Sequence, residues 1–341
     1  MKKVLVLTLM ILTSFPSLFA EGKGERLPIP FGHQDDTFYG IGWDARDGGE
    51  VSSDIRRVCG EYPVVMGFEL SGIELDHERN IDHVPFTLMR QEIQKQLQRG
   101  GIVTLSWHPD NPLTGKNAWD VSSNAVVKSV LPGGSCHADF IQRIKRLCAF
   151  IKTLTPNPST CNPIIFRPWH ENNGSWFWWG KDLCTAQEYK ALWNMLQDTM
   201  IAQGLTNLIW SYSPNYNASL TIADFLTRYP GDDRVQLLGL DAYQNGTRQE
   251  FQTVLDTNLW MLCNYAQQHG KEVALTECGY RSVPDSKWWT GALLPVIQKY
   301  PLKYVLCWRN ENLKERFAPY KGSNDSRDFR KFAKKVIMLK Q

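Results

Sequence analysis

The chain of 341 residues repeats one pattern eight times: a short apolar run, followed by a longer stretch whose apolar residues recur every three to four positions. Short, uninterrupted apolar runs are typical of strands buried on both faces of a parallel sheet, and the longer period is typical of helices that cover such a sheet. Eight units favour a closed barrel over an open sheet, so we predict an α/β fold of the (β/α)8 TIM-barrel type. The predicted strands are 38–43, 64–69, 102–107, 164–169, 208–212, 237–241, 273–277 and 304–308.

The segments between these strands predict helices with defined ends. Apolar residues follow the helical period in 86–97, which is stopped by two glycines, and again in 140–154. Thr185 with Glu188 three positions later forms a capping box, which predicts that a helix begins there and runs to about residue 200. A last helical period, among basic residues, covers 329–337. No low-complexity linker interrupts the pattern, so we predict a single domain over 21–341.

The first twenty residues have the layout of a secretory signal peptide. Lys2 and Lys3 precede an apolar run at 4–12, and a short stretch with serine and proline ends at Ala20. The apolar run is shorter than the roughly 20 residues that span a bilayer. We therefore expect cleavage near Ala20, a periplasmic or extracellular protein, and no membrane association of the mature chain.

Charge and metal-ligand spacing exclude several classes of partner. The formal net charge is only +3, which argues against nucleic acid or an anionic membrane surface. The seven histidines and eight cysteines show no zinc-like spacing, so we expect no metal and no other cofactor. In an oxidising compartment some cysteines are expected to form disulfides, although their pairing is not readable from sequence. We expect a monomer.

Two glutamates follow predicted strands that lie opposite each other across a barrel. Glu171 belongs to the run FRPWHENNGSWFWWG at 166–180, and Glu277 ends the seventh predicted strand. The active site of such barrels lies at the carboxyl ends of the strands, where the long predicted loops 111–136 and 172–184 also belong. Two carboxylates about 5 to 5.5 Å apart suit retaining glycoside hydrolysis, with one as nucleophile and the other as acid/base. The thirteen tryptophans offer flat faces that suit sugar rings.

The run at 167–180 resembles the acid/base segment of glycoside hydrolase family 26, which is best known for β-mannanases. Weaker motifs occur in the same order: GHQ at 32–34, GIGWD at 40–44, SWHP at 106–109, GLDAY at 239–243, TE at 276–277 and WRN at 308–310. The resemblance covers most of the mature chain. It implies that Glu171 is the acid/base and that Glu277 is the nucleophile.

The same resemblance implies roles for six further residues. His108, His170, Trp176 and Trp308 match substrate-binding positions, with Trp308 as the platform beneath the sugar at the cleavage point. Tyr243 matches the tyrosine that holds the nucleophile. Arg167 is either a substrate ligand or an ion-pair partner of a carboxylate, and the sequence leaves these two roles open.

The implied function is a secreted, retaining endo-β-1,4-mannanase that hydrolyses mannan, glucomannan or galactomannan. Spacing alone does not distinguish mannose from glucose or xylose, so the alternatives are an exo-acting enzyme that releases mannobiose or a family 26 glycanase acting on β-1,3-xylan or mixed-linkage glucan. A non-catalytic carbohydrate-binding protein is the alternative from a different class. A metal-dependent hydrolase that uses His108, His170 and Glu171 as ligands is the weakest alternative.

Overall fold

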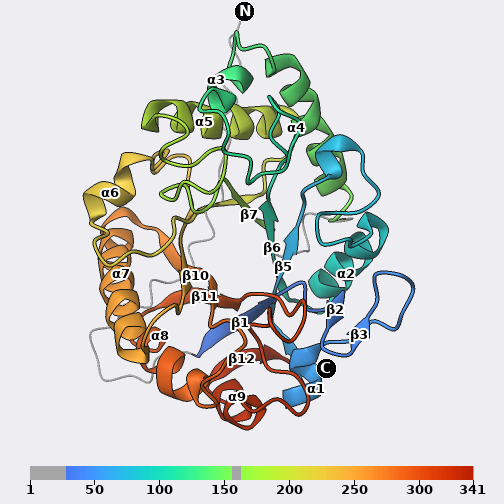
Figure 1. The fold of residues 1–341 in the computed structure, drawn as a ribbon, viewed down its shortest axis with the longest axis vertical. Coiled ribbons are helices and arrows are strands. Elements are labelled where there is room, and N and C mark those ends of the chain that lie inside the picture. Colours follow the sequence, from blue (N-terminus) through green and yellow to red (C-terminus); the bar gives the residue numbers. More distant parts are fainter. Residues whose placement is uncertain (1–27, 156–162, 341) are drawn as a thin grey trace, which may run out of the picture.

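The computed structural model describes residues 28–155 and 163–340, which form a closed barrel of parallel strands within a ring of helices (Figure 1). The predicted signal peptide lies outside the described residues. Eight strands form the barrel, and β11 pairs with β1 to close it. They are β1 (Ile29–Gln34), β5 (Val65–Glu69), β6 (Ile102–Trp107), β7 (Ile165–Pro168), β8 (Ile209–Tyr212), β9 (Leu237–Tyr243), β10 (Glu272–Gly279) and β11 (Leu302–Cys307). The (β/α)8 prediction is confirmed.

Helices connect consecutive strands on the outside of the barrel. The longer ones are α2 (Phe86–Gln98), α4 (His137–Lys152), α5 (Ala186–Ala202), α7 (Arg248–His269) and α9 (Ser326–Ala333), and the shorter ones are α1 (Asp54–Cys59), α3 (Val126–Val130), α6 (Ile222–Thr227) and α8 (Leu294–Ile297). A 3₁₀ turn (Ile73–Leu75) and a π-helical turn (Trp289–Leu293) complete the set. No helix in the described ranges combines the length and the apolar character needed to cross a membrane.

The predicted capping box is present at the start of α5. The Thr185 hydroxyl accepts the Glu188 backbone N–H at 3.1 Å, and the Glu188 carboxylate accepts the Thr185 backbone N–H at 2.8 Å. Thr221 and Thr247 begin α6 and α7 with the same motif. Each box satisfies backbone donors that the first turn of a helix leaves unpaired.

Apolar packing falls into two layers. The larger cluster lies between the strands and the outer helices, and it contains seven fully buried tryptophans, among them Trp107, Trp178 and Trp179. The smaller cluster fills the barrel interior, with Val65, Ile165, Leu237, Ala274, Tyr304 and Leu306 among its members. Polar side chains replace this filling toward the carboxyl ends of the strands, where the site lies.

Two predicted elements are wrong. The first barrel strand is β1, and the predicted strand 38–43 is instead a turn followed by the hairpin of β2 (Tyr39–Gly40) and β3 (Trp43–Asp44). The residues of β1 include Pro30, Gly32 and His33, which obscure the apolar pattern of a strand. Gly32 is required there, because a Cβ would lie 2.9 Å from the Val65 Cβ on the neighbouring strand.

The C-terminal segment also differs from its prediction. The expected helix 329–337 ends at Ala333, and the chain continues as strand β12 (Val336–Leu339). This strand pairs with the start of β1 and with β4 (Tyr62–Pro63), at the end of the barrel opposite the site. Pairing with β1, which is remote in sequence, decides the conformation of these residues.

Candidate active site

Two adjoining cavities open at the carboxyl ends of the barrel strands. The larger one has a volume of about 400 Å³ and is lined by both Glu171 and Glu277. The smaller one has a volume of about 190 Å³ and is lined by neither glutamate. Five side chains line both cavities and therefore mark their junction: His108, Trp119, Arg281, Trp308 and Phe317.

The chain turns sharply after β7 to present Glu171. Trp169 and Glu171 both adopt left-handed backbone conformations, with φ of 52° and 51°. The Glu171 backbone N–H donates to the carbonyl of Ser213 at 2.7 Å, and the Tyr189 hydroxyl holds the Trp169 carbonyl at 2.9 Å. Non-glycine residues seldom adopt this conformation unless the surrounding structure enforces it, and such strain is concentrated at functional sites.

The carboxylates of Glu171 and Glu277 lie close together at the mouth of the barrel. One oxygen of each, with one oxygen of Asp241, lies within 4.8 Å of the others. Burial and then the charge of Glu277 raise the pKa of Glu171 to about 7. The Trp176 indole N–H donates to Glu171 at 2.8 Å and opposes this rise in pKa. Glu171 is therefore poised to hold a proton near neutral pH.

Glu277 receives hydrogen bonds on both of its oxygens. The Arg167 guanidinium bonds one oxygen, and the Tyr243 hydroxyl donates to the other at 2.6 Å. Burial and the charge of Glu277 raise the pKa of the Tyr243 phenol well above its ordinary value, so the phenol stays a donor. A buried carboxylate with a cation and a phenol as donors is stabilised in its ionised form.

Arg167 is an ion-pair partner in this structure. Its side chain is 3% exposed and bonds Asp241 at 2.9 Å as well as Glu277. Asp241 in turn accepts a hydrogen bond from the Thr276 hydroxyl at 2.6 Å. Of the two roles that the sequence left open, these contacts favour the positioning of Glu277 over direct contact with substrate.

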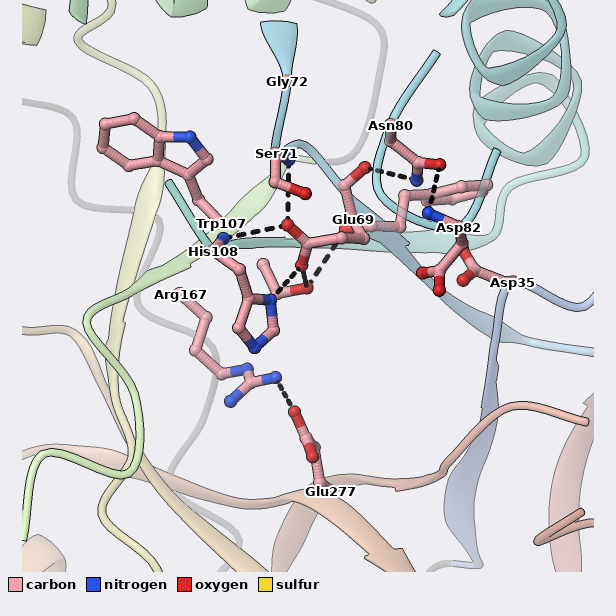
Figure 2. A network of polar contacts seen from close by, with 12 residues as sticks. Asp35, Glu69, Ser71, Gly72, Asn80, Asp82, Trp107, His108, Arg167 and Glu277 are labelled. Atoms are coloured by element: carbon pink, nitrogen blue, oxygen red, sulfur yellow. Dashed lines mark hydrogen bonds and ion pairs between the residues drawn. The ribbon is translucent and has the colours of Figure 1, made fainter. Parts of the chain in front are cut away.

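Glu69 is the centre of a second network, on the other side of the cleft (Figure 2). Its carboxylate bonds the His108 ring at 2.7 Å and the Ser106 hydroxyl at 2.6 Å, and it also accepts the backbone N–H groups of Ser71 and His108. Burial alone would raise the pKa of Glu69, but the charge and hydrogen bonds of His108, with Ser106, lower it to about 2. Burial lowers the pKa of the His108 imidazole, but the charge and hydrogen bond of Glu69 outweigh this effect and raise the pKa above its ordinary value.

The other residues chosen from the sequence meet at the same place. His170, Trp176 and Tyr243 line the larger cavity, and Trp308 lines both cavities. The His170 ring lies edge-on to the His108 ring, 4.4 Å away between centroids. Burial, followed by Arg167 and His108, lowers the pKa of His170 well below its ordinary value, so this imidazole stays neutral. All eight candidate residues therefore belong to one site.

Sequence reasoning missed several residues of this site. Glu69 and Asp241 each end a predicted strand, so an acidic residue at the end of an apolar run was the available signal, although β9 continues two residues beyond Asp241. Trp119 lies in the long loop after β6 and stacks on His108 at 5.2 Å between centroids. No local pattern distinguishes it from the other tryptophans, because only the fold brings its loop to the cleft.

Within the described residues, a single group of acidic, histidine or cysteine side chains has the spacing of a metal site. It consists of Glu171, Asp241 and Glu277. Arg167 already bonds two of these carboxylates and supplies the positive charge that a cation would bring. The seven described cysteines are free thiols, and Cys161 lies outside the described residues.

Known proteins resemble this chain in sequence over most of its length. A sequence model described as glycosyl hydrolase family 26 matches residues 25–288. A mannan endo-1,4-beta-mannosidase of Bifidobacterium adolescentis is 32% identical over 94% of this chain, which spans only 33% of that relative. A mannan endo-1,4-beta-mannosidase of Bacillus subtilis strain 168 is 29% identical over 75% of this chain and 69% of its own length.

Solved structures agree with the sequence matches. A GH26 beta-mannanase from Bacteroides ovatus superposes with a TM-score of 0.87 and 46% identity, and the match covers 92% of this chain and 91% of that one. The catalytic domain of a GH26 endo-beta-1,4-mannanase from Bacillus sp. JAMB-750 has a TM-score of 0.82 and 31% identity, over 92% and 88% of the two chains. This chain belongs to glycosyl hydrolase family 26.

Proposed function

We propose that this protein is a secreted endo-β-1,4-mannanase that hydrolyses β-mannan by double displacement with retention of configuration. Glu277 is the nucleophile and Glu171 is the acid/base. The relatives named as mannan endo-1,4-beta-mannosidases support the substrate and the endo mode. The basic and apolar layout of the first twenty residues supports secretion.

One observation carries the catalytic proposal: two carboxylates lie within 4.8 Å of each other in opposite electrostatic environments. Oxygens this close place the pair with retaining glycosidases, whose carboxyl groups are roughly 5 to 5.5 Å apart, and not with inverting ones, which need roughly 6.5 to 9.5 Å to admit a water. Glu277 is held by Arg167 and Tyr243, whereas Glu171 has a pKa raised to about 7. The environments thus assign a charged nucleophile and a protonated acid.

The reaction proceeds in two displacements. In the first, a Glu277 oxygen attacks the anomeric carbon while Glu171 donates its proton to the leaving glycosidic oxygen, so the glycosidic bond breaks and a glycosyl ester forms. In the second, Glu171 accepts a proton from water, the water oxygen bonds the anomeric carbon, and Glu277 is released. Trp308, which lines both cavities, is placed to stack on the ring that undergoes this chemistry.

Removal of either glutamate tests the proposal. Glu277→Ala and Glu171→Ala are each expected to lower turnover on mannan by several orders of magnitude with unchanged circular dichroism, because covalent and acid/base catalysis each supply large factors. On dinitrophenyl β-mannobioside, whose leaving group departs without protonation, azide added to Glu171→Ala should restore turnover and yield a β-mannobiosyl azide, since a small anion can attack the glycosyl ester without a general base. Near-normal turnover in either alanine variant would remove that residue from its role.

A panel of pure β-glycans tests the substrate. Reducing-sugar release from mannan, and its absence with β-1,3-xylan and mixed-linkage glucan, is expected. Product profiles on mannohexaose and on its reduced form distinguish internal cleavage from release of mannobiose at a chain end. Binding of mannan without any release of reducing ends would point to a non-catalytic carbohydrate-binding protein.

A further inference from the structure

The loop after β10 contains the only two consecutive non-glycine residues at positive φ in the described part of the chain. Ser282 and Val283 are consecutive non-glycine residues with φ of 62° and 41°. A β-branched residue such as Val283 is a genuine outlier at positive φ. Strain of this kind persists only where the surrounding structure enforces it, and it is concentrated where it serves a site.

The neighbouring loop after β11 enforces this conformation. The Ser282 backbone N–H donates to the Arg316 carbonyl at 2.8 Å, and the Ser282 hydroxyl donates to the Lys314 carbonyl at 2.8 Å. The Val283 side chain is fully buried, and its N–H donates to the Tyr280 carbonyl at 2.9 Å. The two loops are therefore tied together beside the cleft.

This arrangement places an exposed ion pair at the junction of the two cavities. The Arg281 guanidinium bonds the Glu315 carboxylate at 2.9 Å, and the two side chains are 67% and 43% exposed. Arg281 lines both cavities, and Glu315 lines the smaller one. An ion pair as exposed as this contributes little to the stability of the fold, so stability does not account for the strained turn that holds it.

The proposed role of Glu171 assigns the aglycon and glycon sugars of the substrate to the two cavities. Glu171 protonates the leaving oxygen, so the aglycon sugars lie on its side, in the larger cavity. The smaller cavity is not lined by Glu171, and it shares the platform Trp308 with the larger one. It therefore receives the chain on the glycon side, beginning with the sugar next to the reacting ring.

We propose that Arg281 and Glu315 form a recognition pair that hydrogen-bonds the sugar next to the reacting ring on the glycon side. A guanidinium offers only donors and a carboxylate only acceptors, whereas each sugar hydroxyl both donates and accepts. The pair can thus engage neighbouring hydroxyls of one pyranose, with one hydroxyl accepting from Arg281 and another donating to Glu315. This inference rests on the proposed β-mannanase function and adds a specificity-determining pair to it.

The experiment compares two substrates that differ only in this sugar. Dinitrophenyl β-mannobioside fills the reacting position and the next glycon position, and dinitrophenyl β-mannoside fills the reacting position alone. Arg281→Gln is expected to lower kcat/KM on the mannobioside about tenfold or more, because hydrogen bonds to charged groups are lost, and to change it less than threefold on the mannoside. Glu315→Gln should give a smaller loss with the same selectivity, since the amide still accepts a hydrogen bond.

The matched control is the ion pair of Lys303 with Glu272, which joins β10 and β11 at their other ends, 2.9 Å apart. Lys303→Gln should leave both substrates unaffected. An equal loss on both substrates with Arg281→Gln, or no loss on the mannobioside, would overturn the recognition role. If the parent enzyme cleaves neither mannoside nor mannan, the proposed function itself fails, which is a separate outcome.

Discussion

At the scale of single residues, the two glutamates owe their different chemistry to their neighbours. Glu277 has a guanidinium and a phenol as hydrogen-bond donors, whereas Glu171 has one neutral indole. The same side chain is therefore stabilised as an anion in one position and as an acid in the other. The 5-residue separation of Trp176 from Glu171 lets the loop after β7 supply both the acid and the donor that tunes it.

The hydrogen bond from Trp176 to Glu171 affects the pH at which activity falls on the alkaline side. The acid must be protonated for the first step, so we expect kcat/KM to fall as the pH rises through about 7, the pKa of Glu171. Trp176→Phe removes a donor that lowers this pKa, and the alkaline limb should therefore move to higher pH. The measurement is the pH dependence of kcat/KM on an oligosaccharide for both proteins.

Trp119→Phe serves as the control, because this tryptophan lines the same cavity but lies against His108. Its alkaline limb should coincide with that of the parent, whatever happens to the size of kcat/KM. A limb that stays in place or moves to lower pH in Trp176→Phe would contradict the proposed tuning of Glu171.

At the scale of elements, the ends of strands supply the acidic residues of the site, and capping boxes define where helices begin. Glu69 ends β5, Asp241 lies near the end of β9, and Glu277 lies near the end of β10, so the strands bring acidic residues to one rim. Three of the outer helices, α5, α6 and α7, begin at capping boxes, which fix where the preceding loop ends and the helix starts.

The cap of α5 provides a test at this scale. Thr185→Ala removes the side chain that accepts the Glu188 backbone N–H, and we expect a loss of about 1 kcal/mol in the free energy of unfolding. Activity below the unfolding transition should stay unchanged, because Thr185 lines neither cavity. Urea denaturation measures the loss, and Thr185→Ser, which keeps the hydroxyl, should stay near the parent. Equal losses in the serine and alanine variants would contradict this role of the hydroxyl.

At the scale of the whole molecule, the buried acid Glu171 lowers the free energy of unfolding above neutral pH. The pKa of Glu171 is raised from 4.5 to about 7 on folding, so the folded state binds its proton more tightly than the unfolded state does. The contribution of this group to stability is complete below about pH 4.5 and is lost as the pH rises through about 7. Above that pH an ionised Glu171 lies buried beside Glu277.

Glu171→Gln removes this penalty, because an amide does not ionise. We expect the variant to have a higher Tm than the parent at pH 8, by a few degrees, and a difference that shrinks toward pH 4.5. Calorimetry across this pH range measures it, with Asp233→Asn as a comparison at a carboxylate that is 83% exposed and lies in the loop before β9. A Tm difference that does not depend on pH would show that Glu171 is not a source of this destabilisation.

The sequence was sufficient for the parts of this protein that depend on neighbours along the chain. Seven of the barrel strands and the capped start of α5 follow from apolar period and local hydrogen-bonding residues, and Glu171 and Glu277 stand out as acids at strand ends. The first strand was missed, because Pro30, Gly32 and His33 are acceptable in β1 only through its packing against β5 and β11. The first two residues of β12, Val336 and Ile337, were predicted as helix because their pairing with β1 is likewise remote in sequence.

Contacts between segments distant in sequence decided which side chains pair within the site and how their charges interact. The pairing of Glu69 with His108, the bridge from Arg167 to Asp241 and Glu277, and the junction formed by Arg281 each join residues from different strands or loops. Electrostatic interactions depend on distance in space and on burial, and neither quantity is encoded in the order of residues. Closure of the barrel brings the separate acids into one site, because it places carboxylate oxygens of Glu171, Asp241 and Glu277 within 4.8 Å of one another.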